Sequence, residues 1–153
     1  MNIKLIVVGK IKESYLEEAI QEYKKRLLPF SAVEMIEIKE RNTPDATKNL
    51  SEEGLDILEE CKSDDFIIAC AIEGKYFSSE EFAQWVDSHT TYSSQRLVFI
   101  IGSSCGLSPA VKQRASLLLS FGPMTYPHQL MRVILLEQIY RLFTILYHKK
   151  YHK

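Results

Sequence analysis

The sequence predicts a single α/β domain in which helices cover both faces of a parallel β-sheet. Short, continuously apolar segments of strand length alternate with longer segments whose apolar residues recur at helical spacing, five times along the 153 residues. Strands that are apolar throughout are typical of parallel sheets buried on both faces. No linker, internal repeat or low-complexity segment interrupts the pattern, so residues 1–153 are expected to form one domain, an α/β/α sandwich.

The expected elements follow one another in strict alternation. The strands are expected at residues 3–8, 33–38, 65–72, 96–101 and 117–120. The helices are expected at 13–27 and 47–61, from 78 onward, from 108 to about 115, and from 127 to about 147. Ser78 with Glu81 three residues later forms a capping box, and Ser108-Pro109 is a typical helix start. The inward residues of the second helix are expected to be Leu50, Leu55, Ile57 and Leu58.

The last helix is expected to be covered on more than one side. Of the 18 residues from 130 to 147, 13 are apolar, while Glu137, Gln138, Arg141 and Thr144 share one polar stripe. So wide an apolar surface predicts a two-fold dimer; the alternative is that the domain itself wraps the helix. Arg132 stands alone on the opposite side. It is expected to reach out of the helix end toward an anion, or else to form a structural ion pair.

Composition and charge exclude several classes of protein. The apolar run at residues 3–8 is short and lacks a cleavage site, and no stretch of about 18 apolar residues exists, so a cytoplasmic protein is expected. Three widely spaced cysteines without a CxxC pair predict reduced thiols and no metal site. Residues 1–102 hold 12 Lys/Arg and 19 Asp/Glu, whereas residues 103–153 hold 7 Lys/Arg and one acid. This asymmetry favours a polyanion-facing C-terminal third, unless folding scatters the charges.

Familiar catalytic motifs are absent or out of context. Residues 102–106 match the G-x-S-x-G of serine hydrolases, but the helix is expected to start about four residues later. The only acid after this serine is Glu137, which is placed to pair with Arg141. No Walker A sequence, G-x-G-x-x-G or HExxH is present. The glycine-bounded turn is therefore interpreted as a place where backbone approaches a ligand closely.

A second glycine- and proline-containing loop, at residues 121–128, follows the last strand. It combines apolar and aromatic side chains with free backbone amides. This chemistry suits an adenine ring, which needs apolar contacts on its faces and backbone hydrogen bonds on its edge. The alternative is an ordinary strand-to-helix connection.

Over essentially its full length, the chain resembles the small SPOUT-class methyltransferases that methylate N3 of a pseudouridine in large-subunit (23S) ribosomal RNA. The residues that carry the resemblance are Ile3 to Lys10, Val98 to Gly102, Gly106-Leu107-Ser108, Met124-Thr125-Tyr126-Pro127-His128-Gln129-Leu130-Met131-Arg132-Val133, Leu136-Glu137-Gln138-Ile139-Tyr140-Arg141, and Tyr151-His152-Lys153. The chain departs from the family pattern at Cys70-Ala71, where the family has leucine and aspartate, at Ser103, where it has glycine, and at Lys150, where it has proline.

The resemblance implies a C-terminal trefoil knot, S-adenosylmethionine as cofactor, a homodimer with the site at its interface, ribosomal RNA as partner, and no metal. It places the cofactor against Cys70, Gly102, Phe121, Gly122, Pro123, Met124, Thr125 and Tyr126. The implied catalytic residues are His152, Tyr151, Arg132 and Arg141. The implied RNA-binding residues are His128, Lys149, Lys150 and Lys153.

The reaction expected from the resemblance is an in-line methyl transfer that positioning accelerates. His152 is the candidate base, because imidazole accepts protons near neutrality. Arg132 or Arg141 would stabilise the developing anion or hold a phosphate. A different class of function is a dimeric RNA- or nucleotide-binding module without catalysis, in which the Ala71 and Ser103 departures have ruined the cofactor site.

Overall fold

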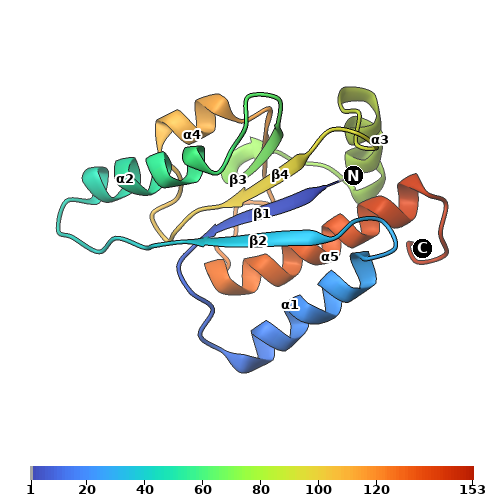
Figure 1. Cartoon of the computed structure of the whole chain (residues 1–153), viewed down its shortest axis with the longest axis horizontal. Helices are drawn as coiled ribbons and strands as arrows, with labels where there is room; N and C mark the ends of the chain where they lie inside the picture. Colours follow the sequence, from blue (N-terminus) through green and yellow to red (C-terminus); the bar gives the residue numbers. More distant parts are fainter. Residues whose placement is uncertain (1) are drawn as a thin grey trace.

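The computed structural model describes residues 2–153, and this part of the chain holds five strands and five helices in strict alternation (Figure 1). The strands are β1 (Ile3–Val8), β2 (Val33–Ile38), β3 (Phe66–Lys75), β4 (Leu97–Ile101) and β5 (Leu117–Leu119). The helices are α1 (Ser14–Leu27), α2 (Ala46–Glu59), α3 (Ser79–His89), α4 (Pro109–Arg114) and α5 (His128–Leu146). The expected elements are confirmed, with their ends shifted by a few residues.

The five strands form one parallel sheet in the order β2-β1-β4-β3-β5. The sequence predicts that β3 ends at Ile72, but the strand continues to Lys75. A register shift lets Lys75 pair with Leu119 of β5. Gly74 permits this, because a Cβ there would overlap the backbone of Leu118. The extension carries β3 past the end of its neighbour β4.

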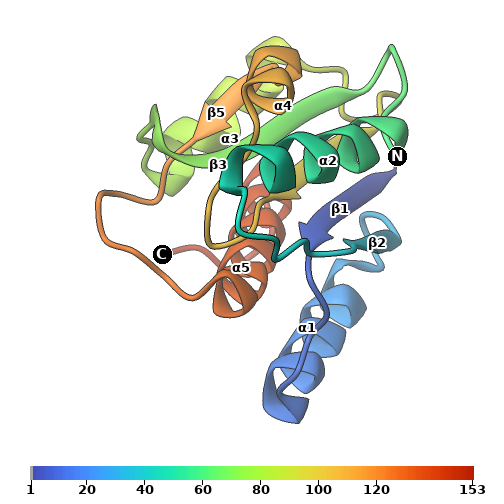
Figure 2. The ribbon, with the colours of Figure 1, turned by 90° about the vertical axis from the view of Figure 1, so that its left-hand side faces the viewer.

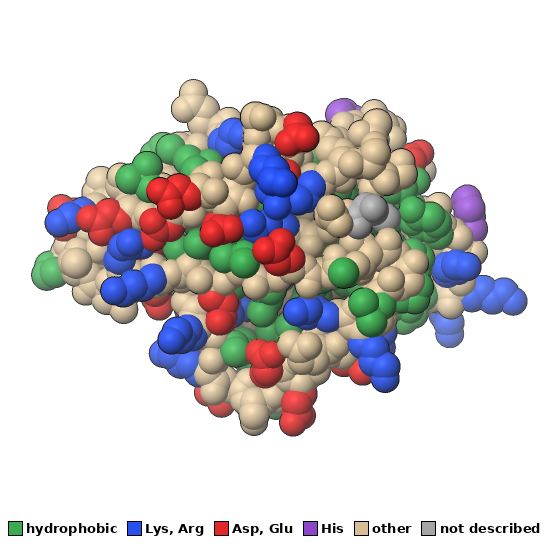
Figure 3. All heavy atoms as spheres, viewed as in Figure 1, with side chains coloured by type: hydrophobic (Ala, Val, Ile, Leu, Met, Phe, Trp, Pro, Cys, Tyr) green, Lys and Arg blue, Asp and Glu red, His purple; other side chains and the backbone are tan. Residues whose placement is uncertain are grey.

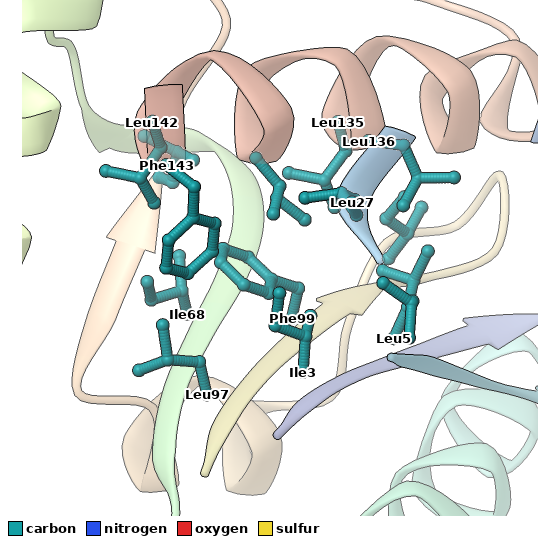
Figure 4. Packing of buried hydrophobic residues seen from close by; sticks show 14 of the residues in the cluster. Ile3, Leu5, Leu27, Ile68, Leu97, Phe99, Leu135, Leu136, Leu142 and Phe143 are labelled. Carbon is teal, nitrogen blue, oxygen red and sulfur yellow. The ribbon is translucent and has the colours of Figure 1, made fainter. Parts of the chain in front are cut away.

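Helices cover both faces of the sheet, as expected (Figure 2). Helices α2 and α4 pack on one face, against the alternate strand residues such as Ile6 and Val98. Helices α1, α3 and α5 pack on the other, with α5 lying between α1 and α3. Figure 4 shows Leu135 and Phe143 of α5 pointing at the sheet toward Phe99 of β4. The cover on α5 thus comes from the sheet and two helices of the same chain, so its apolar width does not by itself require a second copy.

The structure confirms the predicted start of α3 but not the predicted inner face of α2. The capping box of α3 is confirmed, with Ser78 accepting from the Glu81 amide and Glu81 from the Ser78 amide. The inward position of Leu55 in α2 is wrong, because its side chain is 62% exposed. Its neighbour Gly54 faces Ser108, the N-cap residue of α4, so closely that a Cβ would overlap the serine side chain. That contact fixes the rotation of α2 and turns Leu55 outward.

Arg132 also differs from expectation, because its side chain is 0% exposed and does not reach out of the helix. Its guanidinium donates to Glu37 of β2 at 3.0 Å and to the carbonyls of Val8 and Gly9 at 3.1 and 2.7 Å. Burial lowers its pKa, while Glu37 acts in the opposite sense, and a guanidinium remains charged at neutral pH. The structural ion pair is therefore the correct interpretation: Arg132 joins the first turns of α5 to the carboxyl ends of β1 and β2.

Within residues 2–153, no helix is both long and apolar enough to cross a membrane. The same residues contain no cluster of His, Cys, Asp or Glu able to hold a metal ion. All three cysteines are free thiols.

Replacing Arg132 by methionine tests the internal role of this side chain. Arg132→Met removes the arginine donor of two buried carbonyls and leaves Glu37 with only the Ile11 amide as donor, so we expect the free energy of unfolding to fall by about 3 kcal/mol or more. Denaturant titration measures the loss. Arg26→Met, which breaks an exposed ion pair on α1, is the control and should stay close to the wild type. Equal losses in the two variants would contradict the assignment.

Candidate functional site

A cavity of about 660 Å³ opens at the carboxyl edge of β3, β4 and β5. This is the edge where open parallel sheets bind their ligands, and the volume is in the range of cofactor sites. Three segments build most of its wall: the outer half of β3, the loop after β4 and the loop between β5 and α5. The lining residues are Cys70, Ala71, Ile72, Glu73, Ile101, Gly102, Ser103, Ser104, Cys105, Gly106, Leu107, Lys112, Leu119, Phe121, Gly122, Met124, Thr125, Tyr126, Pro127, His128 and Met131.

Glycines shape both loops of this cavity. A Cβ at Gly102 would overlap the carbonyl of Gly106, so only glycine allows the loop after β4 to close on itself. Gly106 has a φ of 88° and Gly122 a φ of 104°, which residues with a Cβ rarely adopt. Ser103 turns its hydroxyl into its own loop, where it accepts from the Cys105 amide at 3.3 Å. The serine that departs from the family pattern is therefore accommodated without closing the cavity.

Seven of the eight residues expected to hold a cofactor line this cavity, and Pro123 does not. His128, expected to face RNA, lines it as well. Sequence reasoning missed Glu73 and Lys112, which form an ion pair of 2.6 Å on the wall. The hydrogen bond from Lys112 holds the pKa of Glu73 below its usual value. Their only sequence signal is their position, just past the expected end of β3 and inside α4.

The chemistry of the wall is mainly apolar. Ile101, Leu107 and Leu119 bring aliphatic side chains from three segments, and Phe121 adds an aromatic ring. Burial raises the pKa of the Cys70 thiol to about 12, so it stays protonated and serves as a small apolar group rather than a nucleophile. An apolar pocket edged by loop backbone suits a flat heteroaromatic ring.

The C-terminal tail, residues 148–153, contacts α5 and α3 through a separate cluster of side chains. The Tyr151 hydroxyl donates to Glu137 at 2.7 Å, and Arg141 donates to the same carboxylate at 2.8 Å. The guanidinium of Arg141 lies 4.8 Å from the centre of the Tyr151 ring and donates to Nδ1 of His152 at 3.0 Å. His152 Nε2 meets Glu80, in the first turn of α3, at 2.5 Å. Three of the four expected catalytic residues, Arg141, Tyr151 and His152, are thus brought together, along with the expected Glu137–Arg141 pair.

These contacts set the protonation of the cluster. Arginine only donates, so Nδ1 of His152 is an acceptor, and the ring proton sits on Nε2, where it is donated to Glu80. The hydrogen bond to Glu137 raises the pKa of Tyr151, which keeps the phenol neutral. The hydrogen bond from His152 holds the pKa of Glu80 below its usual value. His152 therefore has both nitrogens engaged, and Tyr151 is no base at neutral pH.

Arg132, the fourth expected catalytic residue, lies apart from this cluster, near the carboxyl end of β1. Among the described residues, none from 132 to 153 lines the 660 Å³ cavity. The cofactor candidates and the tail thus occupy different places on one chain.

Four of the seven Lys/Arg side chains in residues 103–153 bind groups of the same chain. Lys112, Arg132 and Arg141 pair with Glu73, Glu37 and Glu137, respectively. Arg114 donates to carbonyls near the start of β3. Lys149, Lys150 and Lys153 are exposed, and within residues 2–153 they have no acidic partner. In Figure 3, Lys/Arg and His side chains project at the end of the molecule where the chain terminates in Figure 1.

The G-x-S-x-G match is not a hydrolase site. Helix α4 begins at Pro109, well after the serines, and Ser104 is exposed. In the described part of the chain, no hydrogen bond joins Ser103 or Ser104 to a histidine.

Comparison with known proteins agrees with this geometry. Residues 1–152 match the family model described as "Predicted SPOUT methyltransferase". The chain is 50% identical to the ribosomal RNA large subunit methyltransferase H of Streptococcus sanguinis (strain SK36), and 49% identical to that of Carboxydothermus hydrogenoformans, with all of each chain covered.

A solved structure of a probable methylase family protein from Haemophilus influenzae Rd KW20 shares the fold. Its TM-score is 0.55 at 9% identity, and the match covers 97% of this chain and 67% of the other. At so low an identity, this likeness concerns the fold alone. The family model matches residues 1–152, and the relatives match over the full length of the chain. Both matches show that the chain belongs to the SPOUT methyltransferase family.

Proposed function

We propose that this chain methylates large-subunit ribosomal RNA with S-adenosylmethionine as methyl donor and N3 of a pseudouridine as acceptor. The observation that carries the proposal is the cavity of about 660 Å³ at the carboxyl edge of the sheet. The chain that builds its wall matches the methyltransferase family along its whole length. When bound, the cofactor supplies a methyl group already activated by its sulfonium charge.

The residues on the cavity wall fit this cofactor. Phe121, Leu119 and the protonated Cys70 offer apolar contacts for the adenine ring, and the loop at 121–126 offers backbone groups for its edge. Glu73 lies two residues beyond Ala71, where the family has its acid, and its carboxylate is an acceptor for ribose hydroxyls. We propose that the loops of this cavity form the trefoil knot of the family.

The separate locations of the cavity and the tail on one chain support a homodimer. No tail residue lines the cavity of its own chain, so a second copy that places its tail at this cavity would complete the site. In such a site His152 would accept the imide proton once one of its ring nitrogens is freed from Arg141 or Glu80. The cationic Arg141 would stabilise the resulting anion or hold a phosphate.

The lysines at 149, 150 and 153 would face RNA phosphates. They are exposed and free of acidic partners, whereas His128 sits on the wall of the cofactor cavity and would contact the cofactor or the target base rather than the RNA backbone. Arg132 is enclosed in the core and would act only by holding α5 in place.

Cofactor binding is tested with Gly102→Ala. The added methyl group overlaps the Gly106 carbonyl and displaces the loop, so we expect the Kd for S-adenosylmethionine to rise about tenfold or more in calorimetric titration. Gln84→Ala, an exposed change on α3, is the control and should bind like the wild type. No heat and no thermal stabilisation with the wild-type protein would favour the binding module without catalysis.

The reaction is tested by incubating the protein and cofactor separately with large ribosomal subunits and with assembled ribosomes. Mass spectrometry then maps new methyl groups, expected on N3 of a pseudouridine. His152→Ala should lower the rate about 100-fold or more while leaving cofactor affinity unchanged. The control is His89→Ala, which removes an exposed histidine that stacks on Trp85. Wild-type turnover in His152→Ala would remove this residue from the mechanism.

The role of the tail lysines is tested by replacing all three with glutamine. Loss of three phosphate contacts should reduce the slope of log K for ribosomal RNA against log salt by roughly two, with unchanged cofactor affinity. Replacing Lys24, Lys25 and Lys48, which lie on α1 and α2, gives a matched control. Equal salt slopes for the two triple variants would contradict an RNA-facing tail.

A further inference from the structure

A second cavity, of about 320 Å³, lies beside the first and shares the wall residues Leu119, Phe121 and Gly122 with it. It is bounded by the connection between β3 and α3, the end of β5, and Gln138 of α5. Its volume is at the lower end of the range for small-molecule sites, enough for one flat ring with its substituents. Apart from the shared Leu119, Phe121 and Gly122, none of its wall residues has a role in the proposed cofactor site.

Two polar side chains on its wall each have a hydrogen-bond donor to spare. Gln138 accepts from the Ser79 hydroxyl at 3.1 Å through Oε1, and no described residue accepts from its Nε2. Ser120 is 6% exposed and accepts from the Gly122 amide at 3.1 Å. Its hydroxyl proton has no acceptor in the described part of the chain. Buried hydroxyls are usually paired, so this proton is available to a ligand.

The rest of the wall suits the faces of a planar ring. Phe77 and Phe121 line the cavity from opposite connections, and both rings are only partly buried. The Lys75 ammonium lies 4.8 Å from the centre of the Phe77 ring, so a positive charge stands beside this aromatic surface. Aromatic side chains bind nucleobases by stacking, and a nearby lysine binds the attached phosphate.

The donor of Gln138 selects the kind of base. A uracil-type ring presents two carbonyl acceptors on either side of its imide N–H, whereas a cytosine-type ring replaces one carbonyl with an amino donor. The amide nitrogen of Gln138 can only donate, so it matches a carbonyl of the first ring and opposes the amino group of the second, whereas the Ser120 hydroxyl can donate to a carbonyl or accept from an amino group.

We propose that the second cavity is the subsite for the base to be methylated, a uracil-type ring held by Gln138 Nε2 and the Ser120 hydroxyl. The proposal rests on the proposed methyl transfer to RNA and adds the residues that recognise the acceptor base. The shared wall residues Leu119, Phe121 and Gly122 would separate such a base from the cofactor cavity.

The donors also serve the chemistry. Methylation of an imide nitrogen requires loss of its proton, and the resulting charge spreads onto the two flanking carbonyl oxygens. Hydrogen bonds from Gln138 and Ser120 to these oxygens would favour the anion over the neutral ring. Their removal should therefore lower kcat as well as raise the KM for RNA.

The binding test is an NMR titration of the full-length protein saturated with S-adenosylhomocysteine. Uridine 5′-monophosphate is expected to shift the side-chain amide signal of Gln138 and the backbone amide of Gly122, and cytidine 5′-monophosphate to bind at least about threefold more weakly. Unshifted signals, or equal affinity for the two nucleotides, would overturn the proposal. The titration requires no methyl transfer, so it separates failure of this subsite from failure of the proposed reaction.

The kinetic test uses Gln138→Glu, which keeps the acceptor for Ser79 but removes both amide donors. We expect kcat/KM for ribosomal RNA to fall about tenfold or more, with the Kd for S-adenosylmethionine within about twofold of wild type. Gln84→Glu makes the same change at an exposed position of α3 and is the matched control. Thermal melting establishes that both variants fold, and unaltered kcat/KM in folded Gln138→Glu would overturn the proposal.

Discussion

The buried contact of Arg132 with the ends of β1 and β2 is the constraint on which the two cavities and the tail depend. Helix α5 has an apolar inner face that would slide easily over an apolar sheet, because dispersion and the hydrophobic effect are not directional. The guanidinium removes that freedom, since from a fully buried position it donates to the carbonyls of Val8 and Gly9 and to Glu37. It fixes the start of α5, and with it the end of the loop that closes the larger cavity.

From this fixed start, one helix positions groups at successive turns. His128 and Met131 reach the larger cavity, and Gln138 reaches the smaller one. Glu137, adjacent to Gln138, binds Tyr151 of the tail, and Arg141, one turn later, binds His152. A rigid helix keeps these groups in a constant relation, which matters for a reaction whose rate depends mainly on alignment. The polar stripe expected from the sequence is thus a row of contacts with defined partners rather than a solvated face.

Hydrophobic periodicity located every strand and helix, because strands and helices bury residues at different spacings. It failed where contacts distant in sequence decide the outcome. Leu55 points outward because Gly54 packs on Ser108, and β3 is longer because Gly74 lies against β5. Arg132 pairs with Glu37, 95 residues away, and no local pattern announces such a partner. The residues expected to hold a cofactor, seven of which line the larger cavity, followed from a family signature. The smaller cavity has no motif, because folding alone brings Ser120 and Gln138 to the same wall.

The two hydrogen bonds of His152 decide whether its ring could act as the base of the proposed reaction. In this arrangement Nδ1 of His152 accepts from Arg141 and its Nε2–H donates to Glu80, so neither ring nitrogen has a free lone pair. An RNA phosphate that draws Arg141 away would free Nδ1, while Glu80 keeps the ring oriented through Nε2. Arg141 would then neutralise the phosphate instead of blocking the base. Under the proposed function, Nδ1 of His152 would therefore be free to accept the imide proton only when RNA is bound.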